Sequence, residues 1–250
     1  MRRLVLLLAA VVVLGVAGPA NAVLYGEPDN NTHPYVGMLR FYDANGAYLW
    51  RCTGTALSPT LVLTAGHCVF GATTARWYQT ETPPARPAAD SLGVVGTPVP
   101  NPAYDDFATF PNTSDVGVVK LTSGTASGPY ATLAQPNALD GLDKHTLFDI
   151  VGYGVQDARP AQVANLLRIK GQAKLVNAKS GYSGGFNLHL SSNNGQPHQG
   201  GLCFGDSGGP VLLGSTVYAV NSFVVNGNCA GAGYSYRVDL PAINAWIRAQ

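Results

Sequence analysis

Charged side chains are scarce in this sequence. Only 12% of the residues are Asp, Glu, Lys or Arg, whereas an average soluble protein has roughly 25%. The net charge is +1, and no run of lysines or arginines occurs that would attract nucleic acid or an anionic membrane surface. We therefore expect neither nucleic acid nor a membrane among the partners of the processed chain.

Long apolar runs are also missing, except at the N-terminus. Residues 4–17 are apolar, follow Arg2 and Arg3, and precede the small residues Ala20 and Ala22. A positive start, an apolar stretch and a small-x-small site are typical of a secretory signal peptide. A membrane anchor is the alternative, but a spanning helix needs roughly 20 apolar residues. We expect residues 1–22 to be removed, and residues 23–250 to be secreted.

Cysteines are few and even in number, and none forms a close C-x-x-C pair. The four are Cys52, Cys68, Cys203 and Cys229. Behind a signal peptide they indicate disulfides rather than a zinc site. Four cysteines allow three connectivities, of which proximity in sequence favours Cys52–Cys68 and Cys203–Cys229. We expect no metal or cofactor.

Glycine and proline are plentiful, with 30 and 17 residues. They separate short apolar or alternating runs, which is an all-β pattern. A chain of 250 residues still fits one domain of this class. The runs are Tyr35–Phe41, Leu61–Thr64, Val116–Leu121, Leu147–Tyr153, Leu166–Val176, Val211–Leu213 and Val217–Val225.

Two further segments interrupt this pattern. The Pro- and Ala-rich stretch Thr80–Pro102 is predicted to be surface loop. The C-terminus is predicted to be a helix capped by Asp239, because Ile243, Trp246 and Ile247 share one face. We expect that face to pack on the rest of the fold.

Three polar residues stand in distinctive surroundings. His67 ends an apolar run, Asp115 begins one, and Ser207 lies in the small-residue segment Gly205–Pro210. A serine hydroxyl is a weak nucleophile that needs a base within hydrogen-bond reach, and the base needs an orienting partner. Asp105 and Asp106 compete with Asp115, but the apolar run follows Asp115 directly.

The order of these residues and their flanking motifs resemble the chymotrypsin/trypsin-like serine protease family. The motifs are Thr64–Cys68, Asp115–Leu121, Gly152–Gly154 and Gly205–Pro210. The resemblance spans nearly all of residues 23–250. It implies two packed six-stranded antiparallel β-barrels with a C-terminal helix, an active site between them, and the two disulfides favoured above.

The resemblance also implies a role for each residue. Ser207 would attack the scissile carbonyl, His67 would transfer the proton, and Asp115 would orient the imidazole ring, as the catalytic triad does in that family. The backbone N–H groups of Gly205 and Ser207 would bind the oxyanion. Partners would be protein or peptide substrates and protein inhibitors, and we expect a monomer.

A second carboxylate, Asp206, adjoins Ser207 in an otherwise apolar segment. A buried carboxylate needs a partner, and in the resembling family that partner is the free amine of the processed N-terminus. Here that position is Val23, directly after Ala22, so signal cleavage itself would expose the amine. Cleavage after Ala20, followed by trimming, is the alternative.

The resemblance places the specificity pocket at Gly201 and at Ser222, Phe223 and Val224. No charged residue or histidine occurs from Ser222 to Tyr236, and a pocket without charge cannot repay the desolvation of a charged side chain. We therefore expect an uncharged apolar P1 residue, the residue on the acyl side of the scissile bond.

Two other functions share part of this sequence pattern. A catalytically silent homologue that binds partners usually lacks one of the three residues, and all three are present. The spacing Gly-x-Ser-x-Gly also occurs in esterases of another fold, where a histidine follows the serine. No histidine follows Ser207, so that chain order is excluded.

Overall fold

The computed structural model describes residues 23–24, 26–87, 90–156, 162, 166–192 and 200–250. The predicted signal peptide therefore lies outside the described residues. No helix among the described residues is long and apolar enough to cross a membrane.

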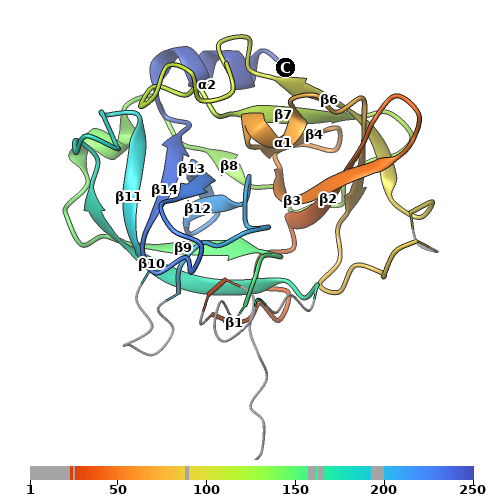
Figure 1. The fold of residues 1–250 in the computed structure, drawn as a ribbon, viewed down its shortest axis with the longest axis horizontal. Helices are drawn as coiled ribbons and strands as arrows, with labels where there is room; N and C mark the ends of the chain where they lie inside the picture. The colour runs from red at the N-terminus through yellow and green to blue at the C-terminus, as the bar shows by residue number, and fades with distance from the viewer. Residues whose placement is uncertain (1–22, 25, 88–89, 157–161, 163–165, 193–199) are drawn as a thin grey trace, which may run out of the picture.

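The N-terminal half forms a closed antiparallel barrel (Figure 1). Its strands follow the order β2-β3-β4-β7-β6-β5. Its inward side chains, which include those of Trp77, Leu39 and Val118, belong to one apolar core. As in other small closed barrels, side chains fill the interior. The strands are β2 (Val36–Tyr42), β3 (Tyr48–Ala56), β4 (Leu61–Thr64), β5 (Thr74–Tyr78), β6 (Val94–Pro100) and β7 (Gly117–Leu121).

The C-terminal half forms a second closed barrel, in the order β9-β10-β11-β14-β13-β12, because β9 also pairs with β10. Short β1 (Glu27–Pro28) pairs with β10, and β8 (Thr132–Leu133) runs parallel to β13. The predicted pair of six-stranded barrels is confirmed. The barrel strands are β9 (Leu147–Gly152), β10 (Ile169–Asn177), β11 (Asn187–Ser192), β12 (Pro210–Leu213), β13 (Thr216–Val224) and β14 (Gly231–Arg237).

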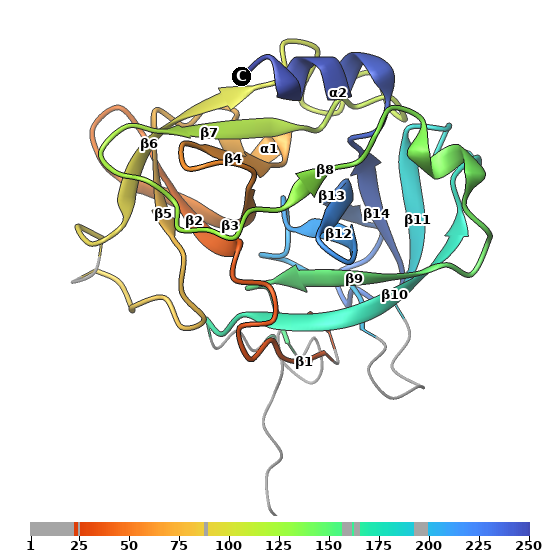
Figure 2. The same cartoon turned by 180° about the vertical axis from the view of Figure 1, so that it is seen from behind.

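Helices are short and lie outside the barrels. α1 (Gly66–Val69) follows β4 directly, η1 (Ala138–Gly141) is a 3-10 turn, and α2 (Pro241–Arg248) ends the fold. Seen from behind, α2 lies along one edge of both barrels (Figure 2). Its residues Ile243 and Ile247 are buried in the core, as the helical spacing predicted.

The predicted cap of that helix was wrong. α2 begins at Pro241 with Leu240 as its N-cap, and no side chain caps it. Asp239 instead accepts hydrogen bonds from the Arg237 guanidinium at 2.9 Å and 2.8 Å, and from the Leu139 N–H. A buried carboxylate gains more from a cation than from a helix end.

The predicted loop over residues 80–102 was also partly wrong, because it contains β6. Its prolines obscured the strand. Pro98 and Pro100 lie in the half of β6 that pairs only with β7, while β5 pairs with the other half. A proline without an N–H donor is tolerated where one side of a strand is unpaired.

Candidate active site

The segment that carries Ser207 is held against the first barrel by β3. The Thr53 N–H donates to the Ser207 carbonyl at 2.9 Å, and the Thr53 hydroxyl donates to the Gly205 carbonyl at 3.0 Å. Gly208 has a φ of +76°, which favours glycine. Ser207 lies in the turn that leads into β12 of the second barrel, so the serine lies at the junction of the two barrels.

His67 lies in α1, and Asp115 lies two positions before the start of β7. The His67 Nδ1 atom lies 2.9 Å and 3.1 Å from the two carboxylate oxygens of Asp115, and the His67 backbone N–H donates to Oδ1 at 2.7 Å. Asp115 is fully buried. Asp105 and Asp106 accept instead from Thr109 and Tyr104. Of the three candidate carboxylates, Asp115 is thus the one bonded to His67.

Burial alone would raise the pKa of Asp115 and lower that of His67. The attraction and hydrogen bonds between the two groups outweigh burial, so the Asp115 pKa lies below its ordinary value and the His67 pKa above its ordinary value. The Asp106 charge raises the His67 pKa further. The pair therefore favours an imidazolium that a carboxylate stabilises.

Sequence reasoning assigned Ser222 only to the pocket wall and missed its second contact. The Ser222 hydroxyl donates a hydrogen bond to Asp115 Oδ2. This contact joins β13 of the second barrel to the carboxylate of the first. No local motif could have revealed it, because 107 positions separate the two residues.

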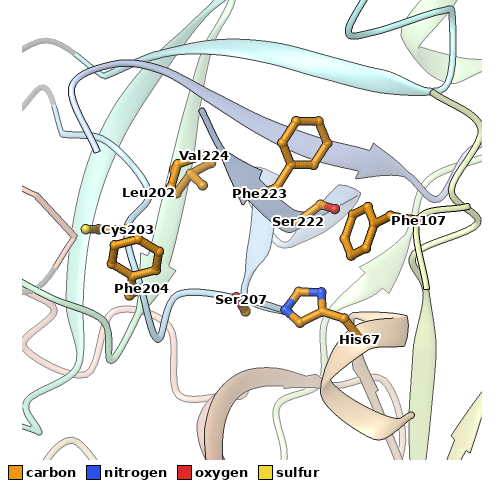
Figure 3. Close-up of a pocket in the computed structure, with 9 residues that line it drawn as sticks. All are labelled: His67, Phe107, Leu202, Cys203, Phe204, Ser207, Ser222, Phe223 and Val224. Atoms are coloured by element: carbon orange, nitrogen blue, oxygen red, sulfur yellow. The ribbon is translucent and has the colours of Figure 1, made fainter. Parts of the chain in front are cut away.

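His67 and Ser207 both line one cavity of about 290 Å³, and the serine lies beside the imidazole ring (Figure 3). No hydrogen bond joins their side chains in the described part of the chain, and such bonds are often loose before substrate binds. The His67 Nε2 atom lies 3.7 Å from the Cys68 sulfur. Cys68 is bonded to Cys52, and Cys203 to Cys229, which are the pairings favoured by sequence.

The turn before Ser207 presents two unengaged donors. Within the described residues, neither the Gly205 nor the Ser207 N–H donates a hydrogen bond to any protein acceptor, whereas the N–H groups of Asp206, Gly208 and Gly209 all do. Gly205 has a φ of +99°, a backbone conformation that glycine adopts readily and that is strained for other residues. This arrangement suits the stabilisation of a developing negative charge.

The cavity wall differs from the expectation at one position. Ser222, Phe223 and Val224 line it, but Leu202 takes the place expected for Gly201. Gly201 exchanges backbone hydrogen bonds with Leu24 at 2.8 Å and 3.0 Å. Apart from His67, the lining residues are uncharged; they are Phe107, Leu202, Cys203, Phe204, Ser207, Ser222, Phe223 and Val224.

A row of aromatic rings continues from this wall, and sequence reasoning missed it. Phe223 stacks on Tyr234 with 4.8 Å between ring centroids, and Phe107 and Phe110 contact Phe223 edge-on. Tyr182 extends the row and is 54% exposed. These residues come from separate loops and strands, so their order in the sequence gives no sign of a shared surface.

Asp206, the residue before Ser207, is fully buried. Its carboxylate accepts from the Gly154 N–H at 2.8 Å and the Cys203 N–H at 3.0 Å. Burial raises the pKa of Asp206 to about 7, although those N–H groups and the Arg51 charge oppose the shift. Val23 is also buried, but no hydrogen bond or ion pair joins it to Asp206 in the described structure. In the uncleaved chain the Val23 nitrogen is an uncharged peptide nitrogen.

The sequence and the fold both resemble known proteases. The family model described as Trypsin matches residues 26–247. Brachyurin of Leptuca pugilator is 25% identical over 209 residues, which cover 82% of this chain and 86% of brachyurin. Granzyme F of Mus musculus is 26% identical over 237 residues, which cover 88% and 89% of the two chains.

Solved structures show the same architecture. The structure titled HL collagenase has a TM-score of 0.70 at 18% identity and covers 91% of this chain and 97% of its own. Human heparin binding protein has a TM-score of 0.68 at 18% identity, with coverages of 91% and 96%. At such identities the likeness concerns the fold alone. The family-model match extends over most of the sequence, and the chain therefore belongs to the trypsin family of serine proteases.

Proposed function

We propose that this protein is a secreted serine endopeptidase that cleaves peptide bonds after uncharged apolar residues. The observation that supports it most is the hydrogen-bonded Asp115–His67 pair beside Ser207, at a cavity without other charged groups. Secretion rests on the N-terminal leader and on the two disulfides, which form in oxidising compartments.

In this proposal the Ser207 hydroxyl oxygen bonds to the scissile carbonyl carbon while His67 accepts its proton. The oxyanion then accepts hydrogen bonds from the N–H groups of Gly205 and Ser207. One such donor typically contributes about 2.7–4 kcal/mol to lowering the barrier. The carbon–nitrogen bond breaks as His67 gives the proton to the leaving amine, and water hydrolyses the acyl-enzyme by the reverse proton transfers.

Leu202 limits the depth of the cavity. It is 3% exposed, and a Cβ atom built on Gly233 would lie only 2.4 Å from its Cγ atom. The side chain thus rests on the β14 backbone and fills space that a large P1 side chain would need. Val224, also in the wall, narrows the cavity further. The P1 residue is therefore apolar and of small to medium size.

Replacing Leu202 by alanine tests this assignment. Peptide anilides that differ only in P1 report kcat/KM, and the wild type is expected to prefer Ala, Val or Leu over Phe, Arg and Lys. Leu202→Ala should raise the Phe-to-Ala ratio about tenfold, since one methylene in a pocket is worth roughly 10–200-fold. Leu92→Ala serves as the matched control, because Leu92 is 72% exposed. Faster cleavage after Arg or Lys would refute the apolar pocket.

A further inference from the structure

Arg51 is a cation beside the candidate active site that the proposed mechanism does not use. It lies in β3, next to Cys52, and is half-buried. Its Nε atom is buried and has no hydrogen-bond partner, and no described residue forms an ion pair with the guanidinium. Buried polar atoms are nearly always bonded, so this orphaned donor indicates a ligand that binds there.

The position of Arg51 follows from the alternation of β3. Arg51 and Thr53 are two positions apart and share one face of the strand, and the Thr53 hydroxyl reaches the Gly205 carbonyl. The Arg51 Nη2 atom lies 3.6 Å from the point where a Cβ on Gly205 would be. The guanidinium therefore adjoins the turn that holds the proposed oxyanion donors.

This position belongs to the leaving-group side of the scissile bond. The P1 side chain enters the cavity lined by Leu202 and Val224, and Arg51 is not among its lining residues. His67 must give its proton to the leaving amine, and its Nε2 atom lies 3.7 Å from the Cys68 sulfur. The disulfide from Cys68 to Cys52 thus borders the leaving group, and Arg51 directly precedes Cys52 in β3.

Two carboxylates that could compete for the guanidinium are already engaged. Both Asp206 oxygens accept backbone N–H groups, and the Arg51 charge lowers the pKa of that carboxyl without a hydrogen bond to it. Asp90 bonds Arg40, the cross-strand neighbour of Arg51, and also Arg86. The positive charge of Arg51 is therefore left for a bound molecule.

We propose that Arg51 binds a carboxylate of the leaving peptide, just beyond the scissile bond. A guanidinium offers two parallel N–H donors that match a carboxylate. The carboxylate belongs either to an acidic side chain at P1′ or P2′, the first two residues after the scissile bond, or to the free C-terminus of a short leaving peptide. This proposal rests on the peptidase activity proposed above and adds a specificity to it.

The test uses quenched fluorescent peptides with one common acyl side. In the first pair, one peptide has Glu and the other has Gln at both P1′ and P2′, and both peptides have an amidated C-terminus. A second pair has a Gln-containing dipeptide leaving group that ends in a free carboxylate or an amide. We expect kcat/KM for the carboxylate member of at least one pair to be about tenfold higher, as for one charge-assisted contact. The preference should weaken at high salt.

Arg51→Gln should reduce that ratio to about one, and Arg51→Lys should retain part of it, because an ammonium is a point charge without the planar fork. Because each ratio is measured within one variant, a general loss of activity or folded protein cancels. Arg86→Gln is the matched control, since Arg86 is exposed and pairs with Asp90.

The outcomes separate this proposal from the peptidase function. A preference in the Glu/Gln pair assigns the carboxylate to a side chain, and a preference in the other pair assigns it to the peptide terminus. Equal rates within both pairs, or a ratio that survives Arg51→Gln, would overturn the Arg51 proposal while leaving the peptidase intact. No cleavage of any peptide would overturn both.

Discussion

At the scale of the residue, the sequence motifs predicted which groups matter better than how they contact one another. His67, Asp115 and Ser207 were chosen from their flanking residues, and the structure brings Asp115 to His67. Ser222 and Leu202 contact the site through the tertiary fold, and their neighbours in sequence give no hint of it. Arg51 was overlooked because an isolated arginine in a strand is ordinarily a surface residue.

The pH dependence of activity follows from His67. In the proposed mechanism only the neutral imidazole can accept the Ser207 proton, so activity should be lost as pH falls through the His67 pKa. Its pKa lies above the ordinary 6.5, since Asp115 outweighs burial. The acidic limb of kcat/KM should therefore have its midpoint above that value and fall about tenfold per pH unit.

Asp106 offers a mild control for this prediction. Its charge raises the His67 pKa without touching the ring, so Asp106→Asn should move the midpoint to lower pH while leaving activity at high pH. Asp105→Asn, at the neighbouring half-buried position, should leave the limb in place, because Asp105 is not among the charges that shift the His67 pKa. A wild-type midpoint below 6.5 would contradict the assignment of His67 as the base.

At the scale of the element, alternation and turn residues predicted many of the strands, but not all. β6 was hidden by its prolines. Four further barrel strands were missed because their residues are mixed in polarity: β3, β5, β11 and β14. β14 has glycines and an alanine where a predicted strand would have branched residues. There, close approach of Leu202 to Gly233 replaces side-chain packing.

The turn after Ser207 requires glycine for reasons of space as well as of backbone conformation. A Cβ on Gly208 would lie 2.0 Å from the Thr64 hydroxyl and 2.6 Å from the Thr53 carbonyl. Gly208→Ala should therefore lower the free energy of unfolding by more than about 4 kcal/mol, the range of diagnostic core defects. Urea denaturation measures this loss.

Gly214 provides the matched comparison. Its φ is also positive, +60°, but nothing lies within 4 Å of its Cβ position. Gly214→Ala should cost only the backbone strain of about 1–2 kcal/mol. Equal losses in the two variants would show that strain alone, and not the clash with β3 and β4, determines the Gly208 position.

At the scale of the whole molecule, the two barrels could be predicted only from the family resemblance, because periodicity indicates strands without their pairing. The long-range partners are set by closure: β9 pairs with both β10 and β12, and β2 with both β3 and β5. The candidate active-site residues come from both halves. Their alignment therefore depends on how the barrels pack.

The processed N-terminus is proposed to stabilise this alignment. Signal cleavage before Val23 would supply an amine to Asp206, whose pKa burial raises to about 7. N-terminal sequencing of active secreted enzyme should begin at Val23, and Asp206→Asn should leave little activity, because losing one partner of a buried pair typically costs about 3–5 kcal/mol. Active enzyme that begins at Asn21 would refute direct activation.

The N-terminal pairing responds to pH in the opposite direction to His67: the pairing is lost as pH rises, whereas the basic form of His67 is lost as pH falls. An amine paired with a carboxylate has a folded pKa above its unfolded value of about 8. Its contribution is complete below that value and is lost as pH rises through the folded pKa. Activity should therefore fall at alkaline pH, and activity that stayed flat far above pH 8 would argue against the pairing.

The most direct test of the central claim is covalent labelling of the secreted protein with a fluorophosphonate, followed by mass mapping of the adduct. We expect one adduct, on Ser207, which disappears in Ser207→Ala and forms far more slowly in His67→Ala. Folded protein that acquires no adduct, or acquires it on another serine, would contradict the assignment of Ser207 as an activated nucleophile.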